Sequence, residues 1–150
     1  MTIRLSSGLR DSIVSNYGLG AMMYKGHIQV YSGAQPASAD MPPTGTLLAF
    51  VTQDGLPIPV PGDDAGGLLL QLGTNAGELV NDGSWVMKGV ASGTPGWWRF
   101  VAVPIDAGML SVTACRIDGA VGDSIAPALG PVTPATRETL AGFLLTLPYQ

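Results

Sequence analysis

The chain has 150 residues, with seven basic and eleven acidic residues and a formal net charge of -4. Only 12% of the residues are charged, about half of the usual ~25%, whereas 46% are hydrophobic. This composition excludes a disordered acidic tail, and a pI of about 4.6 argues against a basic nucleic-acid-binding protein. The 21 glycines and 12 prolines argue against a long helical bundle, and a single cysteine excludes an intrachain disulfide.

The N-terminal segment has the spacing of a short helix. Ser6 or Ser7 can cap a helix over residues 5–17, in which apolar side chains recur every four residues. Glycines end this helix. The small apolar segment Met22-Met23-Tyr24 that follows can pack against a partner or underneath a sheet.

From His27 onward the hydrophobic pattern alternates with a period of two, which is typical of β-strands. Candidate strands, separated by turn signals, cover residues 27–32, 46–52, 68–72, 84–90, 97–103, 108–117 and 139–148. Asp118-Gly119 indicates a hairpin turn. The pattern predicts an all-β fold: a single β-sandwich or jelly-roll-like barrel of seven to eight short strands with one short N-terminal helix. One domain would span residues 1–150, with strands from about 27 to 148.

No catalytic or metal-binding motif is recognisable. His27 is the only histidine, and no Gly-x-Ser-x-Gly elbow accompanies it. Asp63 and Asp64 precede glycines, but their spacing does not match a calcium loop. A cell-wall hydrolase would depend on Glu78 or Glu138, the only glutamates, and neither lies in a catalytic context. We therefore expect no enzyme activity, no catalytic or metal-ligating residue and no cofactor.

The uncharged stretches are shorter than the ~20 apolar residues that a membrane-spanning helix needs, and they contain proline. No secretory signal is visible, so we expect a soluble protein without membrane contact. Cys115 lies in the candidate strand 108–117, where we expect a buried thiol that behaves as a small hydrophobic side chain.

Trp97-Trp98-Arg99-Phe100 is the densest aromatic feature of the chain. Alternation along a strand places Trp97 and Arg99 on one face and the other two side chains on the opposite face. One reading is that one face joins the core and a loop covers the other. The alternative is an interface anchor, because Trp and Arg are favoured at interface centres. The candidate interface residues are Trp85, Trp97, Arg99, Met22, Met23 and Tyr24.

The mean hydropathy of +0.31 predicts that a chain of this size exposes apolar surface unless other subunits cover it. We therefore expect a permanent assembly. A homo-oligomer, either a dimer or a trimer, is the simplest form of it.

Three stretches resemble a family of small virion proteins of tailed bacteriophages. They are Tyr31-Ser-Gly-Ala-Gln-Pro-Ala-Ser-Ala-Asp, Pro43-Thr-Gly-Thr-Leu-Leu-Ala and Gly96-Trp-Trp-Arg-Phe. The shared order is a short helix, a strand that ends in Tyr-Ser-Gly, a Pro-rich loop and two further strands. The resemblance covers residues 5–52 and 94–103 and, weakly, the closing strand, whereas residues 54–82 and 118–137 depart from the pattern.

The resemblance implies a non-enzymatic β-domain of a phage particle, made in the cytoplasm of the bacterial host. The first expectation is a capsid decoration or cement protein that binds across neighbouring subunits of the major capsid protein. The alternative is a tail or head–tail junction protein, such as an adaptor or a fibre-attachment protein. In either case the partners are other virion proteins, with no direct contact to nucleic acid.

Overall fold

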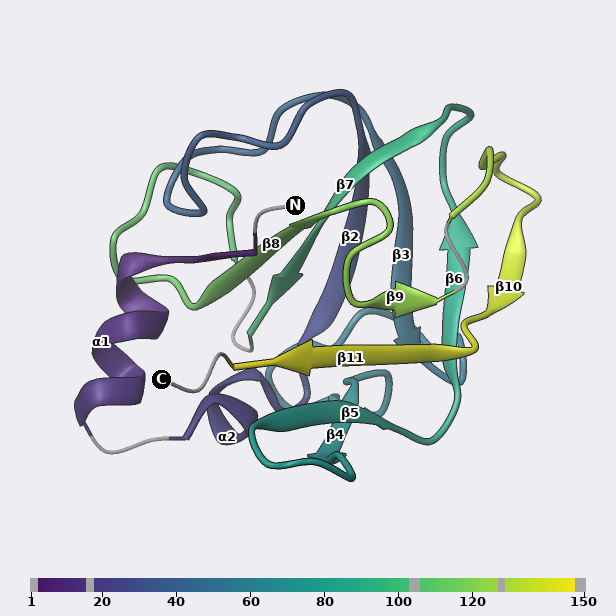
Figure 1. The fold of residues 1–150 in the computed structure, drawn as a ribbon. Helices are drawn as coiled ribbons and strands as arrows, with labels where there is room; N and C mark the ends of the chain where they lie inside the picture. Colours follow the sequence, from purple (N-terminus) through teal and green to yellow (C-terminus); the bar gives the residue numbers. More distant parts are fainter. Residues whose placement is uncertain (1–2, 16–17, 103–105, 127–128, 148–150) are drawn as a thin grey trace.

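The computed structural model describes residues 3–15, 18–102, 106–126 and 129–147 (Figure 1). These residues form eleven strands in two antiparallel sheets, together with two short helices. The expected all-β, sandwich-like fold is therefore confirmed, although the strands are more numerous than the seven or eight predicted. No helix in the described ranges has the length and apolar character needed to cross a membrane.

The larger sheet has seven strands in the order β1-β8-β7-β2-β3-β6-β10. Their bounds are Arg4–Leu5 for β1, His27–Ser32 for β2, Leu47–Gln53 for β3, Trp85–Gly89 for β6, Pro95–Val101 for β7, Arg116–Ala120 for β8 and Arg137–Thr139 for β10. The alternation predicted from His27 is present, because Ile28 and Val30 are buried in the hydrophobic core cluster. The side chains that alternate with them lie on the outer face of this sheet.

The smaller sheet has four strands in the order β4-β5-β11-β9. They span Leu69–Leu72 for β4, Glu78–Asp82 for β5, Gly142–Thr146 for β11 and Ile125–Ala126 for β9. In Figure 1, β11 crosses in front of strands of the larger sheet rather than running alongside them, and β5 lies below β11. The core fills the space between the two layers, and Phe143 lies at its centre, with the ring of Trp85 5.0 Å away and the ring of Trp98 5.9 Å away.

Two helices pack at one end of the sandwich. Helix α1 spans Ser7–Ser15, inside the predicted range of 5–17, and the Ser6 hydroxyl accepts a 3.2 Å hydrogen bond from the Leu9 N–H as its cap. Helix α2 spans Leu19–Met23, where the sequence indicated only an apolar segment. Its Leu19 and Met23 side chains enter the core, and this burial stabilises a helix of only five residues.

The structure corrects the region between residues 108 and 120. The predicted strand over 108–117 is a loop up to Cys115, and β8 begins at Arg116, so Cys115 lies outside the strand and is half-buried. Asp118-Gly119 is no turn but the middle of β8. Gly119 is needed there because a Cβ at this position would lie 2.3 Å from Cζ2 of Trp98. The predicted closing strand, 139–148, is divided between β10 and β11.

Candidate interaction surface

The outer face of the larger sheet carries a row of polar side chains across three neighbouring strands. Gln29 on β2 lies opposite Arg99 on β7, and Arg99 lies opposite Asp118 on β8. Arg99 and Asp118 are nonetheless almost completely buried. Because the core lies on the opposite face, other parts of the chain must cover this polar row.

Two buried ion pairs organise this layer. Arg99 binds Asp118 through two hydrogen bonds, Nε to Oδ1 at 2.7 Å and Nη2 to Oδ2 at 2.8 Å. Arg116 binds both carboxylate oxygens of Asp106, with Nη2 2.6 Å from Oδ1. Such bidentate pairs match the planar fork of a guanidinium group to the two oxygens of a carboxylate.

The other guanidinium N–H groups hold two loops, residues 33–46 and 106–115, over the sheet. Arg99 Nη1 donates to the carbonyl of Met41 at 3.0 Å. Arg116 donates to the carbonyls of Ala39 and Asp40 in one loop and of Met109 in the other. The loops also contact each other directly, since Ser111 N–H donates to the Asp40 carbonyl at 2.9 Å. Both loops are therefore fixed by charged groups that are themselves buried.

The electrostatics of the two carboxylates differ because their surroundings differ. Burial alone would raise the pKa of Asp106, but hydrogen bonds from Arg116 and from Gly108 N–H, together with both arginine charges, hold it below its ordinary value. Burial raises the pKa of Asp118, and the hydrogen bonds and charge of Arg99 oppose that rise. The pKa of Arg116 is raised, chiefly by its hydrogen bonds to Asp106, so Arg116 stays charged.

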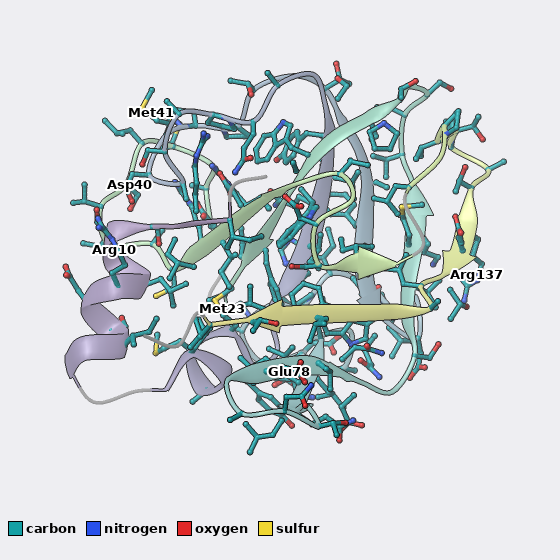
Figure 2. The ribbon with its side chains drawn as sticks, in the orientation of Figure 1. Arg10, Met23, Asp40, Met41, Glu78 and Arg137 are labelled. Carbon is teal, nitrogen blue, oxygen red and sulfur yellow. The ribbon has the colours of Figure 1, made fainter. Side chains whose placement is uncertain are left out.

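The two loops present large apolar side chains to solvent, which we call the loop patch. Its members, with exposed fractions, are Met41 (45%), Met109 (68%), Leu110 (65%) and Val112 (61%). The backbone carbonyls of Met41 and Met109 are acceptors for the buried arginines, so the same contacts that fix the backbone direct these side chains outward. In Figure 2, Met41 lies at the corner of the molecule that also holds Asp40 and Arg10.

A groove of about 470 Å³ lies beside the loop patch. Met109 and Leu110 of the patch form part of its wall, and Met22 of α2 and Cys115 form other parts. The groove therefore extends the apolar surface from the loops toward α2.

Four of the six interface residues that the sequence predicted are buried inside the chain. Trp85, Trp97 and Arg99 are buried inside the chain, with exposed fractions of 1% or less, so they are not available as solvent-exposed anchors. The Trp97 ring stacks on Tyr31 at 4.7 Å, and its Nε1 donates to the Thr44 carbonyl at 3.2 Å. This is the first of the two interpretations drawn from the sequence, in which one face of the strand joins the core and a loop covers the other.

The three candidates in the apolar segment before β2 differ in how far they are exposed to solvent. Met23 is buried in the core, Met22 is half-buried in the groove and Tyr24 is half-exposed. Of the six candidates, Met22 and Tyr24 remain accessible to a partner, and their role stays a prediction.

His27 lies on the outer face of the larger sheet, but its side chain is buried and not exposed to solvent. Its Nε2 lies 3.3 Å from the Gln29 side-chain amide, whose Oε1 accepts a 2.8 Å bond from the Tyr31 hydroxyl. Burial lowers the pKa of His27 from 6.5 to about 4, against the opposing charge of Asp106. His27 is therefore neutral at pH 7 and belongs to a hydrogen-bonded row of side chains.

The neighbouring Asp63 and Asp64 share one loop, and the two glutamates lie on separate strands. Asp64 pairs with Lys25 at 3.8 Å, and Asp63 bridges to Val60 through the backbone. Glu78 on β5 accepts hydrogen bonds from Asn75, whereas Glu138 is exposed on β10 of the other sheet. Within the described part of the chain, no group of three or more His, Cys, Asp or Glu side chains is placed to hold a metal ion.

Sequence reasoning missed the residues that build this surface. The run Met109-Leu110-Ser111-Val112 has the hydrophobicity of a strand, and the alternation rule cannot distinguish a strand from an exposed apolar loop. No sequence pattern indicated the ion pair between Arg116 and Asp106, because it joins a strand to a loop residue ten positions earlier in the chain.

The chain was compared with protein families, with curated proteins and with solved structures, and none of these comparisons found a match.

Replacing one member of a buried ion pair tests this polar layer. We expect Arg99→Met to lower the free energy of unfolding by about 3–5 kcal/mol, because it leaves the Asp118 carboxylate buried without its partner. The double variant Arg99→Met/Asp118→Leu should recover most of that loss, since neither charge is then buried. Urea unfolding at pH 7 measures both. A loss below about 1 kcal/mol for the single variant, or no recovery in the double variant, would contradict this account.

Burial of His27 predicts a dependence of stability on pH. The pKa of His27 is lowered to about 4 in the folded chain, so the unfolded state binds more protons between pH 6.5 and pH 4 and stability falls as the pH decreases through this window. The loss attributable to His27 is about 3 kcal/mol at most. We expect the difference in unfolding free energy between the natural chain and His27→Gln to change by up to this amount from pH 7 to pH 4. A difference that is constant with pH would refute the assignment.

Proposed function

We propose that this chain is a structural subunit of a tailed-phage virion and that it decorates the capsid by binding across neighbouring subunits of the major capsid protein. The observation that carries the proposal is the loop patch. Four large apolar side chains protrude from loops fixed by buried arginines. Holding apolar side chains in water does not stabilise a monomer. At a binding surface the same side chains supply apolar area to bury, and their fixed backbone lowers the entropic cost of association.

The energetics of such an attachment follow from buried area. Each Å² of apolar surface removed from water contributes ~25 cal/mol before the cost of association. A patch whose backbone is already fixed loses little conformational entropy on binding, so more of that contribution remains as affinity. Many copies on one particle would add their contributions against the internal pressure of packaged DNA.

The resemblance to phage virion proteins supports the same proposal from a second direction. The segments that carry it form β2, the loop 33–46, the start of β3 and strand β7. These segments supply Met41 of the loop patch, Arg99 that holds it, and the Trp97–Tyr31 stack beneath it. The part of the chain that resembles the virion family therefore supplies one of the four side chains of the loop patch and one of the two arginines that fix the loops.

The copy number of the chain in purified phage particles tests the location. A decoration protein is present in hundreds of copies per particle, whereas a tail or head–tail junction protein is present in about six or twelve. Quantitative mass spectrometry against the major capsid protein distinguishes these outcomes. Absence of the chain from purified particles would overturn the proposal.

Binding to capsids that lack the chain tests the surface. We expect the double variant Met109→Asp/Leu110→Asp to bind at least tenfold more weakly, because two carboxylates would have to be desolvated in the contact. Val90→Asp is the matched control, since Val90 is also an exposed apolar side chain but lies outside the loop patch. Equal binding by all three proteins would exclude the loop patch as the attachment site.

A further inference from the structure

The two sheets have four edge strands, and one of them is built differently from the rest. Unpaired edges attract other strands, and proteins protect them by making them short or by placing charges on them. Strands β1 and β9 have two residues each, and β10 carries Arg137 and Glu138 in three residues. Strand β4, Leu-Leu-Gln-Leu over Leu69–Leu72, has four residues with no charge and no proline.

The hydrogen-bond pattern shows which backbone groups of β4 face outward. Gly73 N–H donates inward to the Glu78 carbonyl of the β5 side, at 2.9 Å. On the opposite side, Leu68 N–H donates to the Gly26 carbonyl and the Leu68 carbonyl accepts from Lys25 N–H. Because direction alternates along a strand, Leu70 and Leu72 also direct their N–H and C=O groups outward. The described segments supply no backbone partner on that side, and the Leu72 side chain is 82% exposed.

We propose that β4 pairs with β4 of a second copy of this chain, in antiparallel register about a two-fold axis at Gln71. In this register Leu70 of each copy lies opposite Leu72 of the other, and the outward N–H and C=O groups form four hydrogen bonds. The contact is isologous, so each copy uses the same residues.

The composition of β4 favours a second copy over a strand from another protein. A two-fold contact places Gln71 opposite its own equivalent, so a charged residue at this position would face a like charge in the other copy. β4 carries no charge, and Gln71, the residue that meets itself on the axis, is a neutral amide. The dimer would join the two smaller sheets into one continuous eight-stranded sheet, and both loop patches would stay uncovered because they lie on the larger sheet. The inference does not depend on the virion assignment.

Engineered disulfides test the register. In antiparallel pairing about Gln71, the two Gln71 Cα atoms form a non-hydrogen-bonded pair about 4.5 Å apart, whereas the two Leu72 Cα atoms lie about 8 Å apart, beyond the ~7 Å limit for a disulfide. We expect Gln71→Cys/Cys115→Ser to oxidise to a covalent dimer and Leu72→Cys/Cys115→Ser to stay largely monomeric on a non-reducing gel. Both positions are exposed, and Leu72 has an exposed fraction of 82%, so random collision would crosslink both variants. Equal or reversed yields would overturn the proposed register.

The association itself is measured by sedimentation velocity over a concentration series at pH 7. We expect the natural chain to form dimers and Gln71→Glu to raise the dissociation constant at least tenfold, because two carboxylates then face each other on the axis. Thr139→Glu, which adds the same charge to the exposed edge strand β10 of the other sheet, is the matched control and should dimerise like the natural chain. A natural chain that stays monomeric at several hundred micromolar, or a Gln71→Glu variant that dimerises unchanged, would overturn the proposal.

Discussion

The arrangement of this domain depends on two arginines buried on the face of a sheet that would ordinarily meet water. Taking charged groups out of water costs several kcal/mol each unless they are paired and hydrogen-bonded. Arg99 and Arg116 meet that requirement with Asp118, Asp106 and loop carbonyls. A loop that moved away would leave a buried cation with unmet hydrogen bonds, so the ion pairs and the loops stabilise one another.

This constraint explains the surface of the molecule. The polar layer buries two of the seven basic and two of the eleven acidic residues as ion pairs. The surface of the molecule is therefore even less charged than the composition indicates. At the same time the loops present Met109 and Leu110 to solvent. The chain thus combines a layer of buried ion pairs beneath the loops with an apolar surface above them.

The sequence was informative where the structure is regular and local. Alternation in β2 and β7 predicted which side chains share a face, and the helix cap was predicted at Ser6 or Ser7, of which the structure has Ser6. It failed where long-range pairing decides the outcome: Asp118-Gly119 has the chemistry of a turn, but the Arg99 side chain and the Trp98 ring select those residues within a strand. For the tryptophans the sequence left two interpretations open, a buried strand covered by a loop or a partner anchor, because no local rule reveals that a loop from residue 33 onward covers Trp97.

The buried arginines hold the loops in place in the free chain. Amide hydrogen exchange at Ser111, whose N–H donates across the two loops to the Asp40 carbonyl, measures this directly. We expect Ser111 to be protected in the free chain, and we expect Arg116→Met to abolish this protection while amides in the centre of β2 and β7 stay protected. Exchange at Ser111 at the rate of an unfolded chain in the unaltered protein would contradict it.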